Sequence, residues 1–368
     1  MAKSVESHRD WDEPSPKLHQ GMREFMEEVS EPVPSEFDMN TSGIWTLLHW
    51  KRLLSLVSLL KPGDQIHFKD LFELSPEEKE QLPHIPSAFD SHCHLDRCMN
   101  KLGITSHFLA DINSTVTVRE EYQVDVQHAV GVFSDPETYP TRDQVHEWKS
   151  QGVVVAVGLH PRKTNPSAEQ WQRFEELLSW PEITALGEVG IDRMEPVNTW
   201  SSQMLNLDRA LQSLRPDQVL ILHGRSSDDD PDEAWLTCLF KACPRVTREH
   251  LIHCHCFMGS KRLVQRWTSE FPNTYFGFTS IVSRFRNNKD TAKLDCIKWL
   301  SEHRLLLETD APYFPKGGHR RSVPALLGYS ADEVAKIRGV TWQDLLKKTN
   351  SNATRLYLDG AAPATETT

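Results

Sequence analysis

The pattern of hydrophobic and polar positions changes character near residue 86. Beyond it, short runs rich in β-branched residues alternate with longer amphipathic segments that have helical spacing. The runs predict eight strands: Ala88–His94, Val124–Phe133, Val153–His160, Ile183–Val189, Gln218–His223, His250–His255, Thr274–Phe278 and Arg304–Thr309. Between most of them lie helical segments, among them Ala168–Ser179, Ser201–Leu214, Asp232–Ala242, Ser260–Glu270 and Thr291–Glu302.

A strand-then-helix alternation predicts a parallel sheet with helices outside it. Eight such units over about 270 residues match the size of a closed (β/α)8 TIM barrel of the α/β class. A doubly wound open sheet is the structural alternative. We expect the barrel over residues 86–358 and a flexible tail over residues 359–368.

The chain before the barrel divides into two parts. Residues 1–40 are rich in proline, serine and acidic groups, which predicts a mobile arm. Residues 41–85 are expected to form a helical extension, whose most apolar window is Ile44–Leu60. That window contains charged residues and falls short of the ~20 apolar residues that a membrane span needs. We expect it to pack on the protein itself, with a membrane surface or a protein partner as alternatives.

The composition limits the cellular compartments in which we expect the protein and the ways in which it could bind a polyanion. Against 41 Lys and Arg stand 52 Asp and Glu, so the formal net charge is −11. This excludes a generally basic protein that binds nucleic acid by bulk electrostatics. Any polyanion must instead be bound by a local basic patch or by bound metal. The seven cysteines are an odd number without the density of a disulfide scaffold, and no signal peptide is recognisable. We expect a monomer of the nucleus or cytoplasm.

Histidines and carboxylates gather where the predicted strands end. His92 and His94 end the first strand and share one face of it, because alternate residues of a strand point the same way. The other strand ends carry His160, Glu188, His223, His253, His255, Glu308 and Asp310. Barrel enzymes place their catalytic groups on this rim, and neutral histidine with carboxylate is a ligand set for divalent metals.

Each of these residues alone also has a structural explanation. His160 before Pro161, and His253 in an apolar strand, fit histidines that serve only packing. Glu188 alone could be an ion-pair partner, and Asp310 alone could cap a helix. The convergence of several imidazoles and carboxylates on one rim favours a metal site, because such a group needs a cation for balance.

Six motifs containing these residues resemble the TatD family of metal-dependent nucleases and occur in the family's order. They are Asp90–Asp96, Val157–Pro161, Ala185–Asp192, His255–Gly259, Leu307–Tyr313 and Asn352–Tyr357. The long N-terminal extension is similar to that of the larger animal members. Two departures are Met258, where the family commonly has serine, and the loop Gly317–Pro324, which lacks the usual Arg-Asn-Glu-Pro ending.

The resemblance implies two divalent metal ions. His92, His94, Glu188 and Asp310 would hold one, whereas Glu188, His223 and His255 would hold the other, with Glu188 bridging. His253 competes with His255, although the motif favours His255. Mg²⁺ is the expected ion in cells, with Mn²⁺ and Zn²⁺ as alternatives.

The implied activity is hydrolysis of phosphodiester bonds in DNA, RNA or both, as a 3'-5' exonuclease. Two cations ~3.5–4 Å apart can lower the pKa of a water and neutralise a phosphodiester. Asp310 is the expected proton acceptor, and Glu188 the second catalytic carboxylate. Arg162, Arg193 and Arg225 follow strand ends and are expected to bind phosphates.

Two aromatic residues are candidates for contact with the substrate, and two other classes of function remain as alternatives. Tyr313 and Phe257 are candidates for stacking on a terminal base, with core packing as the alternative for Phe257. The chain could instead be an amidohydrolase or phosphotriesterase-like enzyme for small molecules, or a non-catalytic scaffold acting through residues 1–85. The arginine-rich loops favour the nuclease. So does Glu188, which stands where such hydrolases carry a carbamylated lysine.

Overall fold

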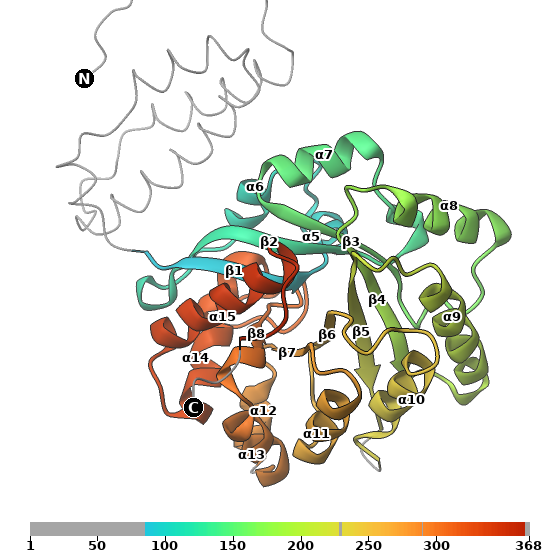
Figure 1. Ribbon diagram of the computed structural model, residues 1–368. Helices are drawn as coiled ribbons and strands as arrows, with labels where there is room; N and C mark the ends of the chain where they lie inside the picture. The colour runs from blue at the N-terminus through green and yellow to red at the C-terminus, as the bar shows by residue number, and fades with distance from the viewer. Residues whose placement is uncertain (1–84, 228–229, 289, 365–368) are drawn as a thin grey trace, which may run out of the picture. The chain divides into compact units, whose positions relative to one another are not determined.

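The computed structural model describes residues 85–227, 230–288 and 290–364, which form a parallel β-barrel surrounded by helices (Figure 1). Within them, eight strands are hydrogen-bonded in chain order, and every neighbouring pair is parallel. The strands are β1 (Ser87–Cys93), β2 (Asp125–Phe133), β3 (Val153–Leu159), β4 (Ala185–Asp192), β5 (Val219–Arg225), β6 (Ile252–His255), β7 (Thr274–Phe278) and β8 (Leu305–Leu307). The predicted (β/α)8 barrel is confirmed.

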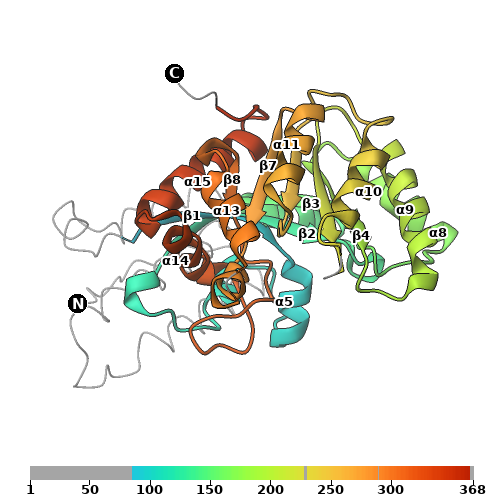
Figure 2. The ribbon, with the colours of Figure 1, turned by 90° about the horizontal axis from the view of Figure 1, so that it is seen from below.

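Helices cover the outside of the sheet (Figures 1 and 2). In the described residues they are α5 (Leu95–Leu102), α6 (Leu109–Asn113), α7 (Arg142–Ser150), α8 (Ala168–Ser179), α9 (Trp200–Gln212), α10 (Glu233–Ala242), α11 (Lys261–Glu270), α12 (Val282–Asn287), α13 (Thr291–Trp299), α14 (Leu327–Arg338) and α15 (Trp342–Tyr357). The bounds of β7 and α8 coincide with the predicted ones, and the other predicted elements are displaced by a few residues. The helix predicted over Ser201–Leu214, for example, begins at Trp200 and ends at Gln212.

The core lies between the sheet and the helices, and local sequence explains both layers. Strand β3 is buried along its whole length, as parallel strands covered on both sides are. Helix α8 buries Trp171, Phe174 and Leu178, whose spacing places them on one face. Its first turn is stabilised by a capping box between Ser167 and Gln170.

The barrel is joined at its carboxyl end by the segment that follows β8. The backbone N–H of Asp310 donates to the carbonyl of His92 over 2.9 Å, and that of His94 donates to Ala311 over 2.8 Å. These bonds extend the pairing of β1 beyond the end of β8. They place Asp310 directly beside the two histidines of the first strand.

The pairing of β1 and β4 with their neighbours is irregular close to two of the predicted metal ligands. The register of β1 against β2 shifts between Asp90 and Cys93, and that of β4 against β5 shifts between Leu186 and Val189. Such bulges re-aim side chains, and here they include His92 and Glu188.

Several expectations fall partly or wholly outside the described residues. The arm 1–40 and nearly all of the extension 41–85, including the Ile44–Leu60 window, are among them. In the predicted tail, the carbonyl of Ala361 accepts a hydrogen bond from Tyr275 Oη at 3.0 Å, so this part contacts the barrel. All seven cysteines are free thiols. No helix in the described ranges has the length and apolarity to cross a membrane.

We expect Gly158→Ala to destabilise the barrel, because β3 and β4 approach closely at this position. A Cβ on Gly158 would lie 2.3 Å from the carbonyl oxygen of Glu188, which is backbone and cannot rotate away. Overpacking of this kind costs about 1–3 kcal/mol, measured as a lower free energy of unfolding in denaturant.

Gly131→Ala on β2 is the matched control. Its Cβ would meet only side-chain atoms, Leu95 Cδ1 at 2.9 Å and Val153 Cγ1 at 3.0 Å, which can move. Equal losses in the two variants would show that the close backbone approach at Glu188 is not a special constraint.

Candidate metal centre

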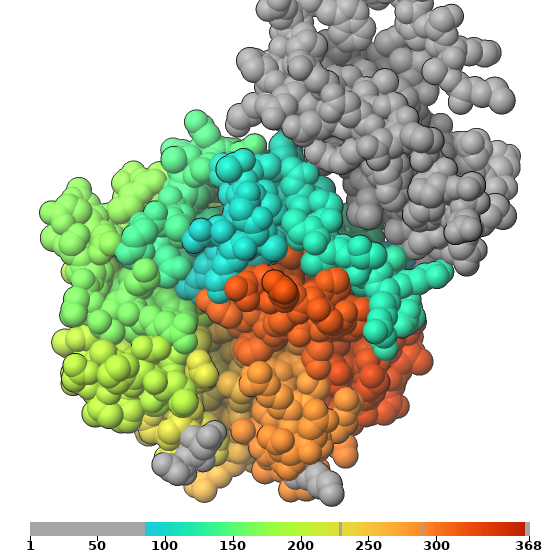
Figure 3. Space-filling model, turned by 180° about the vertical axis from the view of Figure 1, so that it is seen from behind, coloured from blue at the N-terminus to red at the C-terminus, as the bar shows by residue number. Residues whose placement is uncertain are grey.

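Residues from four strands and from the segments that follow β1 and β8 meet at the carboxyl end of the barrel. Figure 3 shows the surface of the molecule from behind, with the blue-green chain that follows β1 next to the orange chain that follows β8. The residues that meet are His92 in β1 and His94 just after it, Glu188 in β4, His223 in β5, His255 in β6 and Asp310 after β8. Five of the six are buried, and the His223 side chain is 14% exposed. The structure therefore brings together all six residues predicted as metal ligands.

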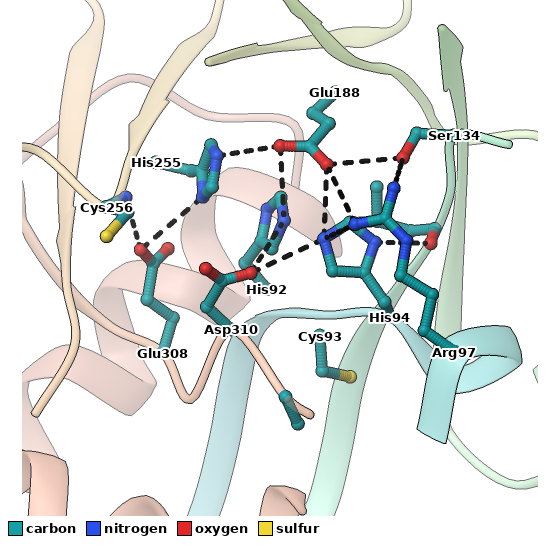
Figure 4. Close-up of polar contacts among 12 residues, drawn as sticks. His92, Cys93, His94, Arg97, Ser134, Glu188, His255, Cys256, Glu308 and Asp310 are labelled. Carbon is teal, nitrogen blue, oxygen red and sulfur yellow. Dashed lines mark hydrogen bonds and ion pairs between the residues drawn. The ribbon is translucent and has the colours of Figure 1, made fainter. Parts of the chain in front are cut away.

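Glu188 lies at the centre of this group (Figure 4). Its Oε1 is 3.1 Å from His94 Nε2, and its Oε2 is 2.8 Å from His255 Nε2. The same Oε2 is 3.0 Å from His223 Nδ1, which in turn is 3.0 Å from His255 Nε2. The two carboxylate oxygens thus face different histidines, as the bridging role predicted for Glu188 requires.

Asp310 faces the histidines of the first strand. Its Oδ1 is 3.4 Å from His94 Nε2 and 3.8 Å from His92 Nε2. The residue has a φ of 49°, in the left-handed region that aspartate tolerates better than most residues.

Burial and the neighbouring charges set the protonation states. Burial disfavours the ionised form of Glu188, yet His160, His94 and His255 hold its pKa well below the usual value. Burial, reinforced by the nearby His255, holds the pKa of His92 well below its usual value. These directions favour the ionised carboxylate and the neutral imidazole, the forms that bind a metal ion. Burial lowers the pKa values of His94, His223 and His255, but the nearby carboxylates outweigh it and raise all three, so metal binding at these imidazoles competes with protonation.

His92 supplies the clearest sign that the group accommodates a cation. Its side chain is fully buried, and neither ring nitrogen has a hydrogen-bond partner among the described residues. An unsatisfied buried polar group costs about 1–3 kcal/mol, so such groups in native proteins call for an explanation. Asp310 Oδ1 is unsatisfied as well, and the two atoms are 3.8 Å apart.

Three sets of potential ligand atoms lie close enough together to surround an ion. Within each set the atoms are no more than 4.8 Å apart, and the sets are His92–His94–Asp310, His92–Glu188–His255 and His160–Glu188–His223. Imidazole nitrogen with carboxylate oxygen suits Zn²⁺, Mn²⁺ and related divalent ions. The donor set and the orphaned nitrogens of His92 therefore fit a divalent metal.

Two of the histidines are oriented by groups behind them. His94 Nδ1 is 3.2 Å from the carbonyl of Val132, which directs its Nε2 toward Glu188 and Asp310. His223 Nε2 is 3.7 Å from Asp192, which leaves Nδ1 facing Glu188. Contacts of this kind fix the tautomer and the direction of a metal-binding imidazole.

The structure separates His255 from its competitor His253. Both nitrogens of His253 face other groups, because Nδ1 is 2.6 Å from Tyr357 Oη and Nε2 is 3.1 Å from Glu308. His255 Nε2 instead faces Glu188, while its Nδ1 is 3.8 Å from Glu308. Burial opposes the ionised form of Glu308, but the two imidazoles lower its pKa to about 2. His253 therefore does not face Glu188. It contacts Glu308, which in turn lies beside His255.

His160 is closer to the centre than its structural explanation implied. Its Nε2 is 3.7 Å from Glu188 Oε1, and its ring lies 4.9 Å from that of His223. Its position at the end of a strand was the available signal, because the residues gathered here share it. Another residue missed from the sequence is Arg97 in α5, which contacts His94 and approaches Glu188.

The three predicted phosphate-binding arginines have different surroundings. Arg193 is buried and makes two hydrogen bonds to Glu233, at 2.6 and 2.7 Å. Arg162 is half-exposed and contacts Glu195 over 2.8 Å. Arg225 ends β5 beside these residues, and no side-chain hydrogen bond or ion pair engages it within the described ranges.

The two predicted stacking residues also differ. Tyr313 lies beside the metal centre, with its ring 6.0 Å from that of His94. Phe257 is only 1% exposed and packs against Trp235 and Phe276, with ring centroids 5.2 and 4.8 Å away. A ring without an exposed face offers no surface to a base, so the structure favours the core-packing alternative for Phe257.

Comparisons with known proteins agree with this architecture. Residues 89–358 match the model of the TatD related DNase family. The chain is 27% identical over 284 residues to the human "3'-5' RNA nuclease TATDN2", a match that covers 75% of this chain and 36% of that protein. It thus spans about a third of the length of that relative. It is also 29% identical to the Salmonella typhimurium "3'-5' ssDNA/RNA exonuclease TatD", over 58% of this chain and 78% of the relative.

The solved structures support the fold. The TatD homologue YJJV of Escherichia coli aligns with a TM-score of 0.57 at 21% identity, covering 74% of this chain and 98% of that one. An uncharacterized amidohydrolase of Saccharomyces cerevisiae aligns with a TM-score of 0.53 at 15% identity, covering 74% and 100%. The family match covers well over half of the chain and includes every residue of the centre. The chain therefore belongs to the TatD related DNase family.

Proposed function

We propose that the chain is a 3'-5' exonuclease that hydrolyses single-stranded DNA or RNA with two divalent ions at the Glu188 centre. The observation that carries the proposal is the buried group of histidines around Glu188 and Asp310 at the barrel mouth. The relatives support the substrate class, because one is named as an RNA nuclease and the other as an exonuclease of single-stranded DNA and RNA.

In this proposal the ligands divide as the family resemblance implied. His92, His94 and Asp310 hold one ion, His223 and His255 hold the second, and Glu188 contributes to both. The short distances from Glu188 to His94 and to His255 support the sharing. Mg²⁺ is the proposed ion in cells, and Mn²⁺ or Zn²⁺ suit the same donors.

The protein's own groups then have distinct tasks. When bound, the two ions would supply an acidified water and compensation for the phosphodiester charge. Asp310 accepts the proton of the attacking water, since its Oδ1 is otherwise unsatisfied. Arg225 binds a phosphate of the substrate chain, because its guanidinium has no competing partner in the described residues. Tyr313 provides an aromatic ring beside His94 on which a terminal base can stack.

Mn²⁺ should raise the melting temperature of the metal-free full chain. A ligand that binds only the folded state stabilises it by ~2.7 kcal/mol at about 100 times its dissociation constant. Differential scanning fluorimetry with and without Mn²⁺ measures this shift, and Glu188→Ala should abolish most of it because that residue serves both ions.

Asp208→Ala is the control for removal of a carboxylate. Asp208 pairs with Arg245 over 2.7 Å on the barrel's outer surface, and its loss should leave the Mn²⁺ shift unchanged. An undiminished shift in Glu188→Ala would rule out the proposed centre.

Asp310→Ala and Asp310→Asn should lower cleavage of a fluorescent single-stranded oligonucleotide by about 10²–10⁴-fold, the usual contribution of a positioned proton acceptor. Labels at either end of the strand report polarity, and DNA, RNA and hybrid substrates report preference. Turnover that survives in both Asp310 variants and in Glu188→Ala would contradict the mechanism. Cleavage of a small phosphotriester without cleavage of any oligonucleotide would instead favour a small-molecule hydrolase.

A further inference from the structure

Arg97 occupies an unusual position for a positive charge, directly beside the proposed metal ligands. It lies in the first turn of α5, immediately after the Asp90–Asp96 motif, and its side chain is only 13% exposed. A guanidinium remains charged at any physiological pH, so a nearly buried arginine needs both a counter-charge and a full set of acceptors.

Asp135, two residues after the end of β2, provides the counter-charge. Arg97 Nε donates to Asp135 Oδ2 at 2.8 Å, and Nη2 donates to Oδ1 at 3.2 Å. Nη2 also donates to Ser134 Oγ at 3.1 Å. This two-point contact fixes the plane of the guanidinium and leaves the outer nitrogen, Nη1, outside the pair.

Nη1 points into the centre (Figure 4). It is 3.0 Å from His94 Nε2 and 3.8 Å from Glu188 Oε1. Nε2 accepts this hydrogen bond in the tautomer whose proton is on Nδ1, the nitrogen that faces the carbonyl of Val132. A metal ion held at Nε2 would occupy the position that Nη1 now faces, and Nη1 would then need another acceptor.

We propose that Arg97 is a phosphate-binding residue of the active site, which transfers the Nη1 hydrogen bond from His94 to an oxygen of the substrate phosphate once the metal is loaded. This inference rests on the proposed function. Asp135 holds the guanidinium in place during the exchange, so that Nη1 stays beside the ligands and needs a new acceptor. A phosphate bound at the centre is the acceptor of matching charge.

The surroundings of Arg97 suit an anion. Lys101, one turn further along α5, lies over the Tyr313 ring at 4.5 Å, and Arg97 lies 5.9 Å from the same ring. Lys163 Nζ is 3.7 Å from Asp135 and 2.8 Å from Glu137. Three cationic side chains, Arg97, Lys101 and Lys163, thus lie close to Asp135 or to the Tyr313 ring.

The alternative is that Arg97 only joins α5 to β2 and balances the charge of Glu188. Such a role would make its removal costly for folding or for metal binding. A phosphate-binding role predicts that removal of Arg97 weakens phosphate binding. Metal binding should be unimpaired, because the substitution removes a positive charge next to the metal.

The test measures three quantities in the full chain for Arg97→Lys and Arg97→Met. Calorimetry gives the affinity for Mn²⁺ alone, and then the affinity of the Mn²⁺-loaded protein for inorganic phosphate. Oligonucleotide cleavage gives kcat and KM. Loss of one charge-assisted hydrogen bond should weaken phosphate binding and lower kcat/KM by about 10- to 100-fold, with Mn²⁺ affinity unchanged or higher. Arg97→Lys keeps the charge but not the two-point contact with Asp135. It provides the same measurements if Arg97→Met folds poorly.

Arg142→Met is the matched control. Arg142 likewise pairs with a carboxylate, Glu182 at 2.8 Å, and lies over the Trp180 ring at 5.5 Å, but away from the centre. It should change none of the three quantities.

The outcomes separate this inference from the proposed function. Wild-type phosphate affinity in both Arg97 variants would overturn the inference, as would a parallel loss of Mn²⁺ affinity. If the wild-type chain cleaves no oligonucleotide, the exonuclease proposal fails. The assignment of Arg97 to phosphate still stands in that case, provided that the variants bind inorganic phosphate less tightly.

Discussion

The charge of one buried carboxylate, Glu188, constrains the whole carboxyl end of this barrel. An ionised group removed from water is costly unless nearby charges or hydrogen bonds compensate it. Here the compensation comes from three other strands, through His94, His223 and His255, each within 3.1 Å of a carboxylate oxygen. The strands must therefore end at one level around Glu188, and a metal ion completes the balance.

The parallel topology makes this meeting of distant residues possible. Residues that end consecutive strands lie on the same rim, so the sequence separation between ligands is absorbed by helices outside the barrel. His92 and Asp310, the two predicted ligands furthest apart in the sequence, are joined directly by a backbone hydrogen bond of 2.9 Å. The same bond that joins the ends of the barrel thus assembles part of the proposed metal site.

The rim residues were predictable because strand periodicity and strand ends are local properties. Position alone could not tell His253 from His255, because both lie on one face of β6. Their roles are separated by Tyr357 and Glu308, which come from the far end of the chain. Phe257 was ambiguous for a similar reason, since its burial depends on a helix and a strand that pack against it. Arg97 carried no local signal, because its partner Asp135 lies 38 residues away.

The acidic net charge of −11 and the proposed polyanionic substrate are reconciled by the arrangement of charges around Arg97. Distant surface carboxylates are screened by salt over about 8–10 Å, whereas groups inside the centre interact at 3–4 Å with little water between them. Within that range Asp135 compensates the charge of Arg97 and leaves Nη1 directed at His94. In the proposed site an anion is bound through directed hydrogen bonds and metal ions rather than through the field of the whole protein, so an acidic chain is compatible with the proposed nucleic-acid substrate.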